Sequence, residues 1–222
     1  MNPNLWSEVD RYLTGQLMPA DPALEGVLQA SAAAGLPAIA VSPAQGKLLQ
    51  LFARMQRART ILEIGTLGGY STIWLARALP ADGRLVTLEL DPKHADVAQA
   101  NFWRAGLAGI IELRLGQAAA TLAQLAAEER EPFDFVFIDA DKASIPEYFD
   151  WAVKLSRPGT AIVVDNVIRQ GAVIDAASED PSVQGVRRFN AQLAQDARVS
   201  ATTIQTVGSK GYDGFTLAIV NG

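Results

Sequence analysis

The sequence predicts an α/β fold: a doubly wound, mostly parallel sheet of seven strands with one antiparallel strand near the C-terminus. Two observations lead to this prediction. Short apolar runs alternate with segments of helical period between residues 60 and 165, as in strand–helix–strand units of parallel sheets. The last two apolar runs, 199–207 and 214–220, are joined by a short glycine-rich segment. So short a connection joins antiparallel strands.

Residues 1–59 are expected to form a helical extension before a core of residues 60–222, within a single domain. The first helix presents an apolar face for packing on the sheet or on a partner subunit, formed by Trp6, Val9, Leu13 and Leu17. Ser42 and Pro43 resemble an N-cap and a first-turn proline that open a helix ending at Met55.

The remaining elements follow from the alternation of apolar runs and helical periods. Strands are expected over 60–64, 84–90, 110–115, 133–139 and 161–165, and helices over 22–34, the segment ending at 79, 92–105, 117–130, 146–156 and 182–196.

A glycine turn, residues 65–69, separates the first strand from the helix after it. Such a turn lets a ligand approach the backbone, and the helix N-terminus presents free N–H groups to it. The spacing is not that of the dinucleotide fingerprint. Glu63, two residues before Gly65, would repel a diphosphate but attract an ammonium group such as that of S-adenosylmethionine (SAM). The alternative is a tight turn that binds no ligand.

Glu89 ends the second strand, 24 residues after Gly65. An acidic residue at this place commonly binds the ribose hydroxyls of a nucleotide-like cofactor. Glu89 is therefore a second candidate cofactor ligand.

The motif LEIGTLGGYS, with the segments 136–142 and 163–171, resembles the class I SAM-dependent methyltransferases. Within that class it is similar to the cation-dependent O-methyltransferases related to catechol and caffeoyl-coenzyme A O-methyltransferases. The resemblance runs from Val41 to the C-terminus and implies a Rossmann-like fold and SAM as cofactor. The cofactor contacts it implies are Val41, Glu63, Gly65, Thr66, Ser71, Glu89, Gln117, Ala118, Asp139 and Asp141.

Asp139 ends the strand 133–139, and Asp165 with Asn166 ends the strand 161–165. Ligands of open parallel sheets collect beyond the carboxyl ends of the strands, so these three side chains are expected to reach one ion. Oxygen donors without His or Cys suit Mg²⁺, with Mn²⁺ or Ca²⁺ as alternatives, and the resemblance implies the same ligands. The alternative is that both aspartates only terminate strands.

A cation at this place would chelate both oxygens of an ortho-dihydroxy ring and lower the pKa of a hydroxyl. Asp139 and Lys142 are the predicted catalytic residues, and the resemblance implies that Lys142 is the general base. The alternative for Lys142 is a surface residue in a polar loop. His94, in the first turn of the helix 92–105, is expected to be exposed.

Three positions depart from the family pattern. Gln117 replaces an acidic residue near adenine, while Gln170 and Ser144 replace asparagines that some relatives carry on the substrate side. Gln117 can still hydrogen bond to adenine. The other two leave the acceptor undetermined.

Composition excludes several classes of protein. A hydrophobic fraction of 49% with 19% charged residues is typical of globular chains. The net charge is −5 and the basic residues are scattered, which argues against a nucleic-acid partner. The absence of cysteine excludes disulfides and thiol chemistry. No signal peptide or membrane span is expected, so we expect a cytoplasmic enzyme.

The predicted function is SAM-dependent, cation-dependent O-methylation of a small catechol-type aromatic substrate. The alternatives are a metal-independent methyltransferase for another acceptor, a nucleotide-dependent oxidoreductase, and a protein that binds the cofactor without turnover. The resemblance and the frequency of twofold oligomers also imply a homodimer.

Overall fold

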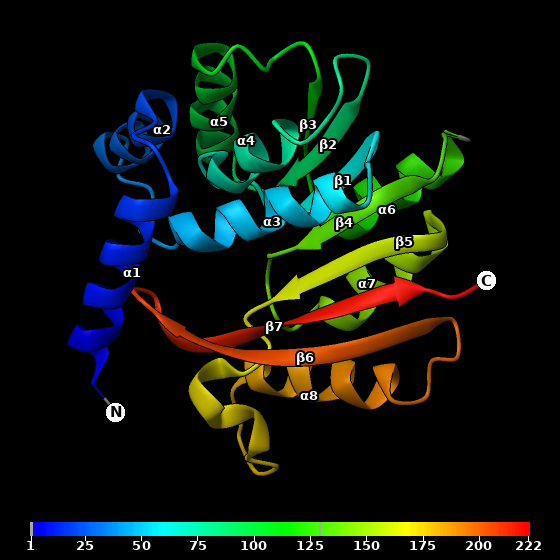
Figure 1. Ribbon diagram of the computed structural model, residues 1–222. Helices are drawn as coiled ribbons and strands as arrows, with labels where there is room; N and C mark the ends of the chain where they lie inside the picture. Colours follow the sequence, from blue (N-terminus) through cyan, green and yellow to red (C-terminus); the bar gives the residue numbers. More distant parts are fainter. Residues whose placement is uncertain (1, 129) are drawn as a thin grey trace.

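The computed structural model describes residues 2–128 and 130–222, and its centre is a seven-stranded sheet (Figure 1). The strand order is β3-β2-β1-β4-β5-β7-β6. β7 pairs antiparallel with β5 and with β6, and the other pairs are parallel. The predicted fold class is therefore confirmed. The strands are β1 (Thr60–Ile64), β2 (Arg84–Glu89), β3 (Ile111–Leu115), β4 (Phe133–Ile138), β5 (Ser156–Asp165), β6 (Val199–Gly208) and β7 (Gly211–Val220).

The helices begin and end close to the predicted positions. They are α1 (Pro3–Leu17), α2 (Pro22–Ala33), α3 (Pro43–Met55), α4 (Tyr70–Ala76), α5 (Pro92–Arg104), α6 (Ala118–Ala127), α7 (Ile145–Lys154) and α8 (Pro181–Leu193), with a 3₁₀ helix η1 (Arg169–Ile174). α6 is shorter than the predicted 117–130, and residue 129 lies outside the described residues. β5 starts five residues earlier than predicted, because Ser156 already pairs with Phe133.

Several helices start with a capping residue followed by proline. The cap side chain accepts a backbone N–H of the first turn, and the proline lacks the N–H that would remain unpaired there. Five helices share this arrangement, with the pairs Asn2–Pro3, Asp21–Pro22, Ser42–Pro43, Asp91–Pro92 and Asp180–Pro181.

Two apolar cores cover the two faces of the sheet. Along β1, Ile61 faces a core with residues of α3, α4 and α5. Leu62 and Ile64 face the opposite core with residues of α6, α7 and α8. This alternation follows from the two-residue period of a strand. In Figure 1, α3 and α4 lie on the near side of the sheet and α6 and α7 lie behind it.

No helix within the described residues is long and apolar enough to cross a membrane. α1 lies beside the turn between β6 and β7 (Figure 1), where Asp10 accepts the N–H of Ser209 at 2.7 Å.

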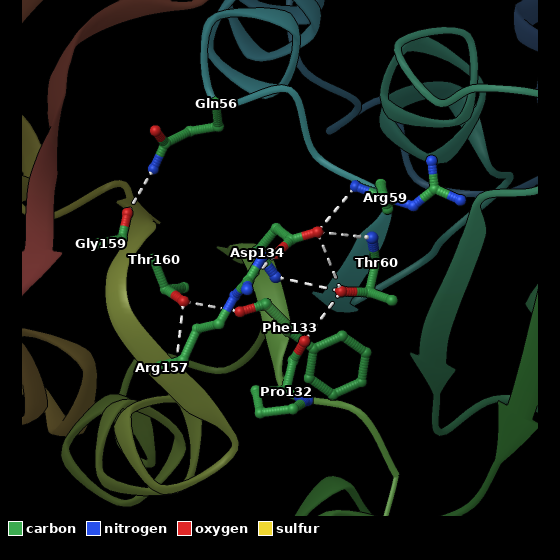
Figure 2. Close-up of polar contacts among 9 residues, drawn as sticks. All are labelled: Gln56, Arg59, Thr60, Pro132, Phe133, Asp134, Arg157, Gly159 and Thr160. Atoms are coloured by element: carbon green, nitrogen blue, oxygen red, sulfur yellow. Dashed lines mark hydrogen bonds and ion pairs between the residues drawn. The ribbon is translucent and has the colours of Figure 1, made fainter.

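Asp134, at the start of β4, joins three strands at the end of the sheet opposite the strand carboxyl ends (Figure 2). Its Oδ2 accepts the N–H groups of Arg59 (2.7 Å) and Thr60 (3.1 Å), and its Oδ1 accepts the guanidinium of Arg157. Asp134 is buried. Burial acts against ionisation, but these donors outweigh it and hold the pKa of Asp134 below its usual value.

Asp134→Ala is expected to destabilise the protein by about 2 to 3 kcal/mol, because it leaves buried N–H groups without an acceptor. For a chain of this size the melting temperature should fall by about 5 to 10 °C. Because the folded-state pKa is depressed, the Asp134 contribution is present at neutral pH and disappears as the pH falls through that pKa. Calorimetry at pH 7 measures the loss. Asp82→Ala, at an exposed ion pair with Arg59, is the control and should melt like the wild type; equal melting of both variants would contradict the assignment.

Candidate functional site

A cavity of about 880 Å³ opens at the carboxyl ends of the parallel strands. Its walls come from loops that follow β1, β2, β3, β4 and β5 and from the segment before α3. This is the edge at which open α/β sheets bind ligands, and the volume is in the range of small-molecule sites. The predicted site residues that line it are Val41, Gly65, Thr66, Ser71, Glu89, Gln117, Ala118, Asp139, Asp141, Lys142 and Asn166.

The glycine turn after β1 packs directly against the loop after β4. Gly65 has φ +103°, and a Cβ there would lie 2.1 Å from the carbonyl oxygen of Asp139. A side chain at Gly65 would therefore push apart the two loops. Leu67 also adopts a positive φ, of 51°, which non-glycine residues rarely adopt. The turn is thus shaped to hold the loops together at the cavity floor.

Glu89 is a rigid part of the cavity wall. Its Oε2 accepts the N–H groups of Leu67 (2.7 Å) and Thr66 (3.3 Å), and its Oε1 accepts those of Leu90 and Asp91 (both 2.9 Å). These bonds fix the carboxylate between the turn after β1 and the end of β2. Charge-assisted bonds of this kind are strong, so Glu89 presents a fixed acceptor to the cavity.

Glu63 lies behind the cavity wall instead of on it. It is fully buried and accepts the hydroxyls of Ser71 (2.6 Å), Thr72 and Thr87 (2.7 Å). Burial raises the pKa of Glu63 to about 7, against the effect of the hydroxyl donors. Glu63 therefore reaches the cavity through Ser71, which lines it.

The loop after β3 carries Gln117 as the N-cap residue of α6, but its side chain makes no capping bond. The Gln117 amide is thus available to a ligand. Across the cavity, Asp141 is held by two donors. Tyr148 of α7 donates its hydroxyl to Oδ2 at 2.6 Å, and the N–H of Ser144 donates to Oδ1 at 3.0 Å. Burial and the bond to Asp141 raise the pKa of Tyr148 to about 12.

Asp139 and Asp165 end neighbouring strands and lie close enough for their charges to interact. Asp165 is almost fully buried, with 3% exposure. Burial and the charge of Asp139 raise the pKa of Asp165 to about 7, although Lys142 and Gln45 act in the opposite direction. Asp165 borders a second cavity, of about 260 Å³, and Asn166 lines both cavities.

Lys142 is buried and donates to Asp139 Oδ1 at 2.7 Å. This position contradicts the alternative of a surface lysine in a polar loop. α8 lies directly behind this loop, because Gly185 has no side chain: a Cβ there would lie 2.1 Å from the carbonyl oxygen of Lys142. The ammonium is therefore fixed at the cavity wall by its ion pair with Asp139, and the backbone of Lys142 is packed against α8.

The donor set of Asp139, Asp165 and Asn166 fits a hard cation. Two carboxylates and an amide supply oxygen only, which suits Mg²⁺ and leaves positions for water or substrate. Asn166 has φ +59°, a left-handed conformation that asparagine adopts more readily than most residues. Within the described residues, no three His, Cys, Asp or Glu side chains are grouped to hold a metal. The candidate centre therefore depends on the amide of Asn166.

Three contributors to the site were not predicted. His94 is half-buried, with Nδ1 3.5 Å from Glu89 Oε1, so the expectation that it is exposed was wrong. Tyr148 reaches Asp141 from the second turn of α7, and Gln45 of α3 donates to Asp165 Oδ2 at 2.6 Å. The position of His94 near Glu89 could have been predicted, because His94 lies in the first turn of α5, five residues after Glu89. The contact of Gln45 with Asp165 could not have been predicted from the sequence, because the two residues are 120 positions apart.

Known proteins resemble this chain in sequence and in fold. The sequence model of the O-methyltransferase family matches residues 18–219. A catechol O-methyltransferase of Niastella koreensis is 56% identical over 99% of this chain and 100% of the relative. The O-methyltransferase from Bacillus cereus, solved in complex with SAH, is 59% identical with a TM-score of 0.98, over 99% of this chain and 100% of that chain.

A second solved structure is the O-methyltransferase TomG from Streptomyces achromogenes, involved in tomaymycin synthesis and determined in complex with SAM. It is 54% identical, with a TM-score of 0.97 over 100% of both chains. The family match covers most of the chain, and the predicted resemblance is confirmed at the level of the family. This chain belongs to the O-methyltransferase family of enzymes.

Proposed function

We propose that this enzyme transfers the methyl group of SAM to one hydroxyl of an ortho-dihydroxy aromatic compound, with a divalent cation, Mg²⁺, at Asp139, Asp165 and Asn166. One observation carries the proposal. Asp139 and Asn166, which follow two adjacent strands, line the cavity that also contains Glu89 and the buried Lys142, and Asp165 lies directly before Asn166. The name of the Niastella koreensis relative supports the catechol assignment.

The cofactor is proposed to lie across the ends of β1, β2 and β3. Glu89 accepts the ribose hydroxyls, and the Gln117 amide with Ala118 contacts adenine. Val41, Gly65, Thr66 and Ser71 surround the methionine part, with Glu63 beneath Ser71. Asp139 and Asp141 close the cavity on the opposite side. The SAH and SAM complexes of relatives with the same fold support this placement.

The cation, when bound, supplies charge that lowers the pKa of a chelated hydroxyl. Asp139 and Asp165 hold it by charge and Asn166 by its amide. Lys142, 2.7 Å from Asp139, is placed to accept the hydroxyl proton in its neutral form. The cavity walls hold the acceptor and the methyl donor in line. This orientation is the larger contribution to catalysis, because the methyl group is already electrophilic.

Glu89→Ala is expected to weaken SAM binding by about 1.5 to 3 kcal/mol, the value of a hydrogen bond to a charged group. The Kd should rise about 10- to 150-fold, as measured by isothermal titration. Because Glu89 also accepts four backbone N–H groups, a melting curve must show that the variant is folded. Glu25→Ala, on α2, is the control. An unchanged Kd in folded Glu89→Ala would show that Glu89 does not bind the ribose.

The acceptor class is tested with the three isomers of dihydroxybenzene. Only the ortho isomer, catechol, places both oxygens within reach of one cation. With labelled SAM and Mg²⁺, catechol should be methylated at least about 100-fold faster than resorcinol and hydroquinone, since a chelate stabilises the oxyanion by several kcal/mol. Equal rates for the three isomers would overturn the chelate and leave methyl transfer to another kind of acceptor.

We also propose a homodimer formed through α1. This helix has the predicted apolar face but no buried residue, and Leu17 is 73% exposed. Apolar area of this kind marks association surfaces, and twofold dimers are the commonest oligomers. Light scattering should give twice the mass of the chain for the wild type and for Gln16→Asp, and a smaller mass for Leu13→Asp. A monomeric wild type at working concentration would refute the dimer.

A further inference from the structure

Arg169 follows the end of β5, three residues after Asn166, and its backbone is tightly fixed. Its φ is +55°, in the left-handed region that arginine rarely adopts. Asp213 of β7 holds this turn: its Oδ1 accepts the N–H groups of Ile168 at 2.9 Å and Arg169 at 3.1 Å. Strained residues persist where the surroundings determine them fully, and they cluster at ligand sites. The bonds to Asp213 therefore fix the backbone of Arg169, a residue that lines the cavity.

The guanidinium of Arg169 has no partner among the described residues. Arg169 lines the 880 Å³ cavity, and its Nε is buried without a hydrogen-bond acceptor. Other arginines with partly buried side chains are paired, such as Arg77 with Asp21 and Arg114 with Glu128. A buried donor without an acceptor costs about 1 to 3 kcal/mol, so an unsatisfied group in a native protein calls for an explanation. A ligand that supplies the acceptor is one.

Arg169 lies apart from the candidate contacts of the adenosine part of SAM. In the strand order β3-β2-β1-β4-β5, the candidate cofactor residues Glu89 and Gln117 follow β2 and β3. Arg169 follows β5, the strand that also ends in the candidate cation ligands Asp165 and Asn166. Arg169 therefore lies on the cation side of the cavity, away from the strands that carry the candidate adenosine contacts.

The chemistry of the side chain defines the group it would bind. A guanidinium is planar and always charged, and it binds carboxylates through two parallel N–H donors. Asp141 and Glu147 line the same cavity and would repel an anion close to them. An acidic acceptor would thus be attracted at one place and repelled elsewhere, which fixes its orientation.

We propose that Arg169 binds a carboxylate of the methyl acceptor, so that the preferred substrates are ortho-dihydroxy aromatic acids. This inference rests on the proposed function, because it takes the acceptor to be a catechol. The carboxylate of SAM is the other possible source of the same chemistry. An experiment with a charged and an uncharged version of one acceptor distinguishes them.

The test compares 3,4-dihydroxybenzoate with its methyl ester, which differ by one negative charge at the same ring position. Wild-type enzyme should favour the acid in kcat/KM by about 10- to 100-fold, the effect of a charge-assisted bond. In Arg169→Met, kcat/KM for the acid should fall by about 10- to 100-fold. The kcat/KM for the ester and the KM for SAM should both stay within about twofold of the wild-type values. Arg84→Met, at an exposed residue that begins β2, is the control and should behave as the wild type.

Three results would overturn the proposal. The first is equal use of acid and ester by the wild type. The second is an equal fall in kcat/KM for the acid and the ester in Arg169→Met. The third is a raised KM for SAM with either acceptor, which would assign the guanidinium to the carboxylate of the cofactor.

A binding measurement separates failure of this inference from failure of the proposed function. If wild-type enzyme methylates neither acceptor, titration of 3,4-dihydroxybenzoate into the SAH-loaded protein still reports on Arg169. Binding that is lost in Arg169→Met would keep the carboxylate site and reject the methylation of catechols. No binding to the wild type would reject both.

Discussion

Asp165→Asn is expected to lower kcat for catechol methylation by at least about 100-fold. Asp165 contributes one of two carboxylates to the candidate cation site, and electrophilic stabilisation by a cation is worth several kcal/mol. The side chain is buried and accepts a hydrogen bond from Gln45 at 2.6 Å, so an amide of the same shape should fit. SAM binding should stay close to wild type, because Asp165 does not line the main cavity. Steady-state kinetics and isothermal titration measure the two quantities.

Asp175→Asn provides the matched control, since this exposed aspartate lies ten residues further along the chain and caps Ala177. It should retain wild-type kcat and SAM affinity. Wild-type activity in Asp165→Asn would remove the cation assignment, whereas loss of SAM binding would show that Asp165 serves the cofactor instead.

Lys142→Met is expected to lower kcat by about 100- to 10,000-fold, the usual contribution of a general base. Methionine keeps the length of the side chain and fits the buried site, but it cannot accept a proton. Cation affinity should be equal or higher in this variant, because Asp139 Oδ1 loses the ammonium that lies 2.7 Å away. A loss of rate with retained cation binding is the result that separates a base from a residue that only shapes the site.

Lys154→Met is the control for Lys142. Lys154 is exposed at the end of α7, 3.8 Å from Asp150, and its loss should not change the rate. A Lys142→Met enzyme within about tenfold of wild type would fall below the range of general-base effects and would reject Lys142 as the base. A variant that no longer binds the cation would give Lys142 a structural role.

Local signals explain why most of the fold could be predicted from the sequence. Capping residues followed by proline, such as Asp91–Pro92, mark helix starts within a residue. The apolar runs of β1 and β4 are buried on both faces, as continuous hydrophobic strands should be. The start of β5 was missed because Ser156 and Arg157 are polar and precede Pro158 and Gly159. The strand begins at Ser156 because this residue pairs with Phe133, and a contact between distant residues cannot be predicted from the local sequence.

The site residues that could be predicted from the sequence are those that stand at the ends of strands. Asp139 and Asp165 come together because β4 and β5 are parallel neighbours. Glu63 shows the limit of such reasoning: its place in β1 could be read, but not that Ser71, Thr72 and Thr87 would surround it. Gln45 and Arg169 depend on how distant segments pack, which periodicity cannot report. Contacts of this kind need the tertiary structure.

The most direct measurement is methyl transfer from labelled SAM to catechol with Mg²⁺, again with excess EDTA, and once more after Mg²⁺ is restored. Chelation should abolish turnover and added Mg²⁺ should return it. SAM binding measured in EDTA should stay within about twofold, because only Asp139 is shared between the proposed cofactor contacts and the cation ligands. Turnover that is indifferent to EDTA would contradict a cation at Asp139, Asp165 and Asn166.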